Sequence, residues 1–129
     1  MGKEKGFTVT EVTVVIVVLI IIGVFFLIQR NDLETTARDQ QRKVAINSIY
    51  HGLTEVFYKE NGFYPTSIDP DKLTSVPAEL FTDTSGVKID ETDSEYFYEG
   101  VNCGSDGKCK GFKLTALLEK EAEYVKEIR

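Results

Sequence analysis

Residues Val14 to Ile28 form the segment that most restricts how this chain can fold. These fifteen consecutive residues are all Val, Ile, Leu or Phe apart from Gly23. Counted from Phe7, the apolar segment has 22 residues and a single charged side chain, that of Glu11. A helix of this length is about 33 Å long, which is enough to cross the hydrocarbon layer of a bilayer. Because lipid offers the backbone no hydrogen-bonding partners, we expect residues 7–29 to form a membrane-spanning helix.

Glu11 is unusual in this position, because a carboxylate near the end of a membrane helix costs about a few kcal/mol unless it is paired. One interpretation places the side chain at the level of the lipid headgroups, in contact with water. The residues around it favour a functional interpretation. The sequence Gly-Phe-Thr-Val-Thr-Glu at residues 6–11 has Lys3 and Lys5 upstream and the apolar run downstream. This pattern resembles the processing site of type IV pilins and pseudopilins, the class III signal.

The resemblance implies that a membrane enzyme, prepilin peptidase, cuts between Gly6 and Phe7 and methylates the new amino terminus at Phe7. Residues 1–6 would then be a leader peptide. After the cut Phe7 carries a cationic amine, and assembly stacks the apolar helices into a low-dielectric bundle. Glu11 could pair there with the Phe7 amine of a neighbouring subunit, an attraction of roughly 4 kcal/mol at 4 Å and an effective dielectric of ~20, before desolvation. We therefore expect Phe7 and Glu11 to be the assembly residues.

The charges that flank the apolar run predict its orientation. Lys3 and Lys5 precede it, so the short amino terminus should stay in the cytoplasm and most of the chain should lie outside. An ordinary secretory signal would need a small-residue cleavage site after the apolar run, and residues 35–37 (Thr-Thr-Ala) match that requirement weakly. An uncut single-pass anchor also fits the hydropathy. The resemblance implies a single-pass protein of the cytoplasmic membrane that later enters an extracellular pilus or an envelope pseudopilus.

Residues 30–58 predict an amphipathic continuation of the same helix. They contain no Pro and one Gly, Gly52, and many of their apolar side chains recur at spacings of three and four. These apolar residues are Leu33, Ala37, Val44, Ile46, Ile49, Leu53, Val56 and Phe57. We expect much of the opposite, solvent-facing side to be formed by Asp39, Arg42, Lys43, Glu55 and Lys59. One continuous helix from about Phe7 to Tyr58 would resemble the pilin spine, and the alternative is two helices with a hinge near residues 29–32.

The helix should stop at Asn61-Gly62, which is a strong turn signal. Residues 61–66 resemble the loop that follows the spine helix in many pilins, and we expect Tyr64 to pack its ring on the core. Residues 67–94 are rich in loops, with a short helix expected from Asp69 to Leu73, a turn at residues 77–80 and a strand at residues 87–89. Within and around this loop, a solvated acidic face is predicted from Asp83, Asp90, Glu91, Asp93 and Glu95.

Two β-prone segments, residues 96–101 and 111–118, predict a hairpin whose turn lies within residues 102–110. Residues 119–128 fit a third strand or a short closing helix. Their Glu and Lys content favours a helix locally, whereas the family pattern favours a strand, and a strand is our prediction.

Cys103 and Cys109 lie six positions apart in a segment expected outside the cytoplasm, and they predict one disulfide. A metal site would need more ligands, and the only histidine is His51. Many pilins enclose a large C-terminal loop with their disulfide, whereas this one would close a tight turn. Some pseudopilins bind calcium near the C-terminus, but the oxygens of Asn102, Ser105 and Asp106 do not form a recognised calcium pattern. We therefore expect no cofactor, and calcium at these oxygens is the less favoured alternative.

The composition excludes other classes of function. A formal charge of −6 argues against a general nucleic-acid surface, which would be basic, so no direct nucleic-acid partner is predicted. The sequence pairs no His with a Ser or Cys in a recognisable motif and has no Gly-rich phosphate loop, so we expect no enzymatic activity.

The expected fold is α+β, with the long N-terminal helix packed on a small C-terminal antiparallel sheet. Residues 59–129 would form this head, resting on Ile46, Ile49, Leu53 and Phe57. The resemblance implies a structural subunit of a type IV pilus-like filament, used for adhesion, motility or uptake. Its partners would be further copies of itself, prepilin peptidase, an inner-membrane assembly platform and, before assembly, membrane lipid.

Two alternatives remain open from the sequence. A pseudopilin or minor pilin of a type II secretion or competence machine shares every motif described above. A membrane-anchored extracellular binding domain that never polymerises belongs to a different class, and it has no use for Glu11.

Overall fold

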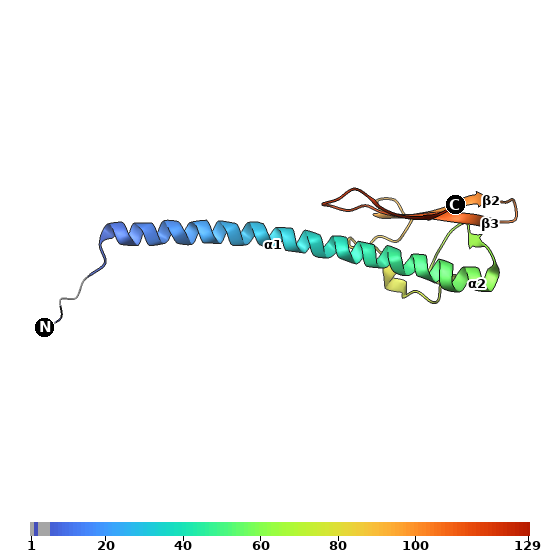
Figure 1. Cartoon of the computed structure of the whole chain (residues 1–129), viewed down its shortest axis with the longest axis horizontal. Coiled ribbons are helices and arrows are strands. Elements are labelled where there is room, and N and C mark those ends of the chain that lie inside the picture. Colours follow the sequence, from blue (N-terminus) through green and yellow to red (C-terminus); the bar gives the residue numbers. More distant parts are fainter. Residues whose placement is uncertain (1, 3–5) are drawn as a thin grey trace. The chain divides into compact units, whose positions relative to one another are not determined.

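The computed structural model of the chain describes Gly2 and residues 6–129 (Figure 1). It consists of two compact units, one ending at Thr35 and one running from Thr36 to Arg129. Lys3 and Lys5, which predict the orientation of the amino terminus, lie outside the described residues.

One α-helix, α1 (Val9–His51), belongs to both units, and Figure 1 shows it as an unbroken ribbon. A π-helical turn, η1 (Gly52–Phe57), and a short helix, α2 (Tyr58–Asn61), continue it. The alternative of a hinge near residues 29–32 is therefore wrong. The predicted stop is confirmed: Gly62 has φ 76° and donates its N–H to the Tyr58 carbonyl oxygen at 2.7 Å, which caps the helix.

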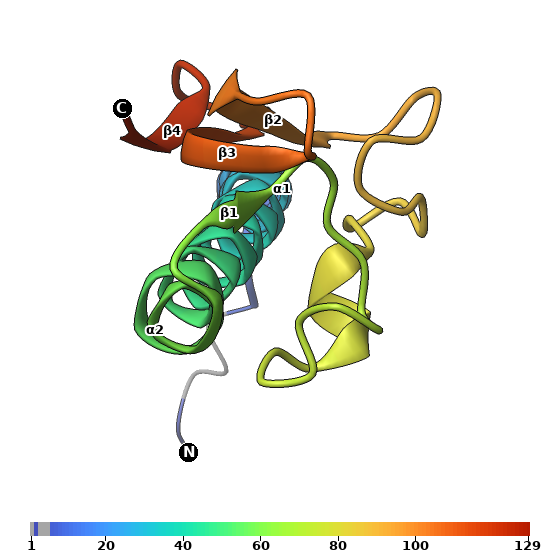
Figure 2. The ribbon, with the colours of Figure 1, turned by 90° about the vertical axis from the view of Figure 1, so that its right-hand side faces the viewer.

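The head contains a four-stranded antiparallel sheet built around β3 (Lys108–Ala116). Along one side β3 pairs with β2 (Tyr96–Cys103), and along the other it pairs with β1 (Tyr64–Pro65) near its start and with β4 (Tyr124–Ile128) near its end. The strand predicted near the C-terminus is thus present as β4. Figure 2 shows the sheet lying on one side of the helix in the second unit, with the loop of residues 66–95 and the 3-10 helix η2 (Ala78–Phe81) on a neighbouring side.

The core of the head lies between the helix and the sheet. Ile46, Ile49 and Leu53 of the helical spine are fully buried, and Phe112 and Leu114 of β3 are fully buried opposite them. Phe57 packs against this core while remaining partly exposed. The ring of Tyr64 is also buried, with ring centroids 4.8 Å from those of Tyr58 and of Phe112, as predicted.

Val44 does not belong to the buried face, although its spacing suggested that it would. It is 57% exposed, because it lies two residues from both Arg42 and Ile46, on the opposite side of the helix from these buried positions. Leu33, in the first unit, is 69% exposed.

Several charged residues expected to face solvent are buried. Asp39 and Arg42 are 3% and 2% exposed, and they pair with each other at 2.8 Å. Asp83 is 6% exposed and accepts the backbone N–H of Glu95, whose own carboxylate contacts Arg42 at 2.7 Å. The prediction of a solvated acidic face is therefore wrong for Asp83 and Glu95. Their carboxylates accept hydrogen bonds from groups of the protein, and these bonds replace hydrogen bonds to water.

Two loop segments differ from the prediction. Residues 69–73 form a hydrogen-bonded turn without continuing into a helix, and the chain then turns so that Leu73 and Val76 are buried against the spine. Residues 87–89 form only an isolated bridge between Lys88 and Thr82. The Asp83 carboxylate accepts the N–H groups of residues 85 and 87, which closes the chain into a turn there and leaves no length for a strand.

Candidate processing and assembly site

The predicted processing site lies just before the start of α1. Gly6 and Phe7 have no regular secondary structure, and Phe7 is 82% exposed. Thr8 is the residue before the first helical position, Val9. The bond between Gly6 and Phe7 therefore lies in exposed, non-helical chain two residues ahead of the helix.

Thr8 and Glu11 form a capping box that begins the helix. The Glu11 carboxylate accepts the Thr8 backbone N–H at 2.8 Å and the Thr8 hydroxyl at 3.1 Å. In return the Thr8 hydroxyl oxygen lies 3.3 Å from the Glu11 backbone N–H, which donates to it. Reciprocal bonds of this kind satisfy donors that a helix otherwise leaves free at its first turn. The Thr-x-x-Glu spacing at residues 8–11 signals a capping box, a local role for Glu11 in addition to the assembly role predicted from the sequence.

The apolar half of α1 presents its side chains outward. The large apolar residues from Val14 to Ile28 are each between 47% and 66% exposed. Within the described residues this is the one helix long and apolar enough to cross a membrane. A continuous apolar surface of this size has to be covered by lipid or by other apolar surfaces. The segment therefore fits a membrane anchor or a signal sequence.

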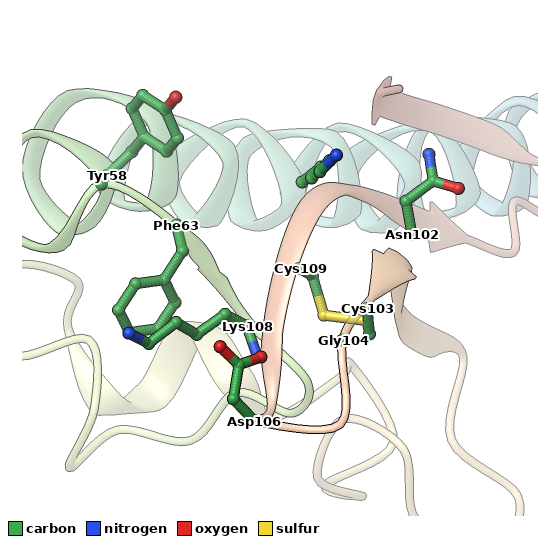
Figure 3. Close-up of a pocket in the computed structure, with 10 residues that line it drawn as sticks. Tyr58, Phe63, Asn102, Cys103, Gly104, Asp106, Lys108 and Cys109 are labelled. Atoms are coloured by element: carbon green, nitrogen blue, oxygen red, sulfur yellow. A yellow bond between two sulfur atoms is a disulfide. The ribbon is translucent and has the colours of Figure 1, made fainter.

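A disulfide joins Cys103 at the end of β2 to Cys109 of β3, as predicted (Figure 3). The two cysteines are register partners in the sheet, and their Cα atoms are 3.8 Å apart. Gly100 makes room for the bond, because a Cβ at this position would lie 2.6 and 2.8 Å from the two sulfur atoms. Since disulfides persist in oxidising compartments, the bond indicates that the head lies outside the cytoplasm.

A shallow hollow beside the disulfide is lined by the turn between β2 and β3 together with Tyr58 and Phe63. The Lys108 ammonium lies 5.2 Å from the centre of the Phe63 ring. Figure 3 shows Asn102 and Asp106, two of the residues considered for calcium, on either side of the disulfide. Asp106 accepts the Lys108 backbone N–H at 3.2 Å, which is a turn-forming bond. Among Gly2 and residues 6–129, no three His, Cys, Asp or Glu side chains are grouped so that they could hold a metal ion.

Arg42 is the centre of a polar cluster that our sequence analysis did not predict. Its Nε and Nη2 donate to the two carboxylate oxygens of Glu95 at 3.0 and 2.7 Å, and Nη2 also donates to Thr84 at 3.0 Å. Nη1 donates to Asp39 at 2.8 Å, and Nη2 is 3.1 Å from Glu119. In the part of the chain that the structure describes, every buried side-chain nitrogen and oxygen has a hydrogen-bonding partner.

Glu119 and Asp39 extend this cluster to the connection between β3 and β4. Arg38 donates to both carboxylate oxygens of Glu119 at 2.7 and 2.8 Å, and this pairing, with help from Arg42, lowers the pKa of Glu119 to about 2. Burial raises the pKa of Asp39, but the backbone N–H groups of Glu119 and Lys120 and the Arg42 guanidinium outweigh it, so that the pKa is lowered overall. We call Arg38, Asp39, Arg42, Thr84, Glu95 and Glu119 the Arg42 cluster.

Comparison with protein-family models, with curated proteins and with solved structures finds no match for this chain. The architecture nevertheless resembles that of a pilin. A long N-terminal helix is apolar in its first half, and in the second unit it packs on a small antiparallel sheet that carries a disulfide.

Proposed function

We propose that this chain is a structural subunit of a type IV pilus-like filament. The subunit is cut after Gly6, is N-methylated at Phe7 and assembles with further copies through its apolar helix. Prepilin peptidase, an inner-membrane assembly platform and, before assembly, membrane lipid are its other partners. Its role is mechanical rather than enzymatic, and its head lies outside the cytoplasm.

The observation that carries this proposal is the exposure of the apolar half of α1. One helix supplies an uncovered apolar surface from Val14 to Ile28 and, further along, the buried residues that support the head. Lipid covers such a surface before assembly, and the helices of other subunits cover it afterwards. The same side chains therefore serve in both states without refolding.

The capping box explains how Glu11 is tolerated before assembly. In the single chain its carboxylate is held by the N–H and hydroxyl groups of Thr8, which lowers the cost of placing it at the membrane. In the filament the Phe7 amine of a neighbouring subunit supplies the opposite charge. This pairing sets the axial register of one subunit against the next, much as one buried polar residue sets register in a coiled coil.

The same observations support a pseudopilin or minor pilin in a secretion or competence machine, because such a subunit needs the same helix and the same terminus. They give less support to an anchored domain that never polymerises. A capping box can be formed by Gln as well as by Glu, so a helix that meets no neighbouring subunit does not need the negative charge of Glu11.

Substitutions at the capping box test the proposal. Glu11→Gln keeps an oxygen that can accept the Thr8 bonds but removes the charge, whereas Thr8→Ala keeps the charge and removes the hydroxyl. We expect Glu11→Gln to remain in the membrane fraction and to be absent from sheared filaments, and Thr8→Ala still to assemble. Filaments of Glu11→Gln at the wild-type level would contradict the assembly role of the charge.

A further inference from the structure

The Arg42 cluster lies at the start of the helical segment that belongs to the head. The second unit begins at Thr36, and the helical members of the cluster are residues 38, 39 and 42. Further along the helix the contacts with the core change in character, since Ile46, Ile49 and Leu53 are fully buried apolar side chains. Ion pairs thus join the helix to the rest of the head at residues 38, 42 and 43, and the fully buried apolar residues of the helix follow from Ile46 onward.

The cluster also joins the helix to two connections that are distant in sequence. Glu95 immediately precedes β2, and Glu119 follows β3. Tyr96 and Ala116, the neighbouring strand ends, are register partners in the sheet. Both connections therefore leave the sheet at the same end, and both are bound to the same two turns of α1.

We propose that the Arg42 cluster is the junction through which tension along α1 enters the head. Hydrogen bonds and close ion pairs are directional and weaken steeply when their atoms slide apart, so they resist displacement of the helix along its axis. Apolar contacts are non-directional and allow more sliding for the same loss of contact. The inference rests on the proposed function only for the origin of the tension, which is extraction of the helix from the membrane and traction on the filament.

Burial makes this junction costly to break. Arg42 is 2% exposed, so sliding the helix separates its buried guanidinium from the Glu95 and Glu119 carboxylates until the head opens. Asp39 moves with Arg42 on the same helix, and its carboxylate loses the backbone N–H groups of Glu119 and Lys120. Lys43 adds a peripheral contact, with its Nζ 2.8 Å from the Glu121 carboxylate. Removal of the Arg42 charge is therefore expected to weaken the head most when force arrives along α1 from residues that precede the cluster.

Single-molecule pulling on the full chain in a lipid nanodisc tests the proposal. One attachment point is the C-terminal residue Arg129, and the other is placed either at position 30, ahead of the cluster, or at position 60, at the far end of the spine. The test variant is Arg42→Met, which keeps most of the side-chain volume. The matched control is Ile49→Ala, which removes buried apolar contacts from the same helix.

With the attachment at position 30, we expect Arg42→Met to unfold about 100-fold faster under load than the wild type, because a buried charge network is lost. With the attachment at position 60, the factor by which Arg42→Met accelerates unfolding should be at least about tenfold smaller, because the load does not pass through the Arg42 cluster. Ile49→Ala should accelerate unfolding by similar factors in the two geometries. Equal effects of Arg42→Met in both geometries would overturn the proposal.

If Arg42→Met does not fold, Glu119→Gln serves in its place, because it keeps the side-chain shape and removes one charge of the junction. Glu119→Gln should also accelerate unfolding more with the attachment at position 30 than at position 60, by a smaller factor than Arg42→Met. Equal acceleration at the two positions would count equally against the proposal. These measurements need no filament, so their failure would leave the proposed subunit role intact. Normal assembly of Glu11→Gln, which would contradict the assembly role of the charge, would likewise leave the pulling result unaffected.

Discussion

Gly52 lies where the loop after the spine presses against the helix. A Cβ at this position would meet Val76 Cγ2 at 2.4 Å and the Ser75 hydroxyl oxygen at 3.3 Å. We expect Gly52→Ala to lower the free energy of unfolding by about 1–3 kcal/mol, because overpacking outweighs the better helix propensity of Ala. Chemical denaturation of the full chain in detergent micelles measures this change.

Gly23 provides the matched control, since it is also a helical glycine. A Cβ there would have nothing within 4 Å, so Gly23→Ala should leave unfolding of the head unchanged. Equal stability of Gly52→Ala and the wild type would show that the loop moves away from the helix without cost.

The burial of some side chains could be predicted from the sequence, and the burial of others could not. Burial of Ile46 and Ile49 followed from their spacing, because an apolar face of a helix has few alternatives to a core. Burial of Arg42 could not be predicted from spacing, because its partner Glu95 lies 53 positions away and is brought close to it only by the folding of the sheet. Asp39 likewise binds the backbone N–H of Glu119, 80 positions away.

The connection between β3 and β4 makes the stability of the head depend on pH. The pKa of Glu119 is lowered from its ordinary value of 4.5 to about 2 by Arg38 and Arg42. Its stabilising contribution is therefore complete above about pH 4.5 and is lost as the pH falls from there through about 2. Asp39 shifts in the same direction. We expect Glu119→Gln to flatten part of this acid dependence in denaturation curves recorded between pH 6 and 2.

Glu123 is the control for this measurement, because its side chain is exposed in the same connection. Glu123→Gln should keep the wild-type acid dependence. An unchanged slope in Glu119→Gln would contradict the role assigned to its pairing with the two arginines.

The disulfide between β2 and β3 closes a short loop, and its contribution should be correspondingly modest. Replacing Cys103 and Cys109 together by Ser should lower the free energy of unfolding by roughly 2 kcal/mol, according to the chain-entropy relation for a loop of about seven residues. The fold should persist, because seven register pairs join the two strands. Denaturation with and without reductant checks this, and loss of the sheet on reduction would contradict it.

The elements themselves were largely predictable. The helix, its stop at Asn61-Gly62 and the hairpin each follow from local patterns that no distant contact overrides. The local composition of residues 119–128 favoured a helix, and the strand found there was predicted from the family pattern alone. Residues 69–73 and 87–89 were not predictable, since their conformation depends on buried contacts of Leu73 and on the Asp83 carboxylate. At the candidate site the capping box was readable from Thr8 and Glu11, whereas the Arg42 cluster required the fold.

The molecule as a whole combines an apolar helix that needs lipid or neighbouring helices with a head that buries its own core. We propose that this helix is first an anchor and then a filament core, and that the change begins with cleavage after Gly6.

The intact mass and N-terminal sequence of the protein purified from cell envelopes test this claim most directly. We predict a chain that begins with N-methylated Phe7. A chain that still begins at Met1 would show a permanent anchor, and one that begins after Ala37 would show a secreted domain. Either of the last two results would contradict the filament subunit.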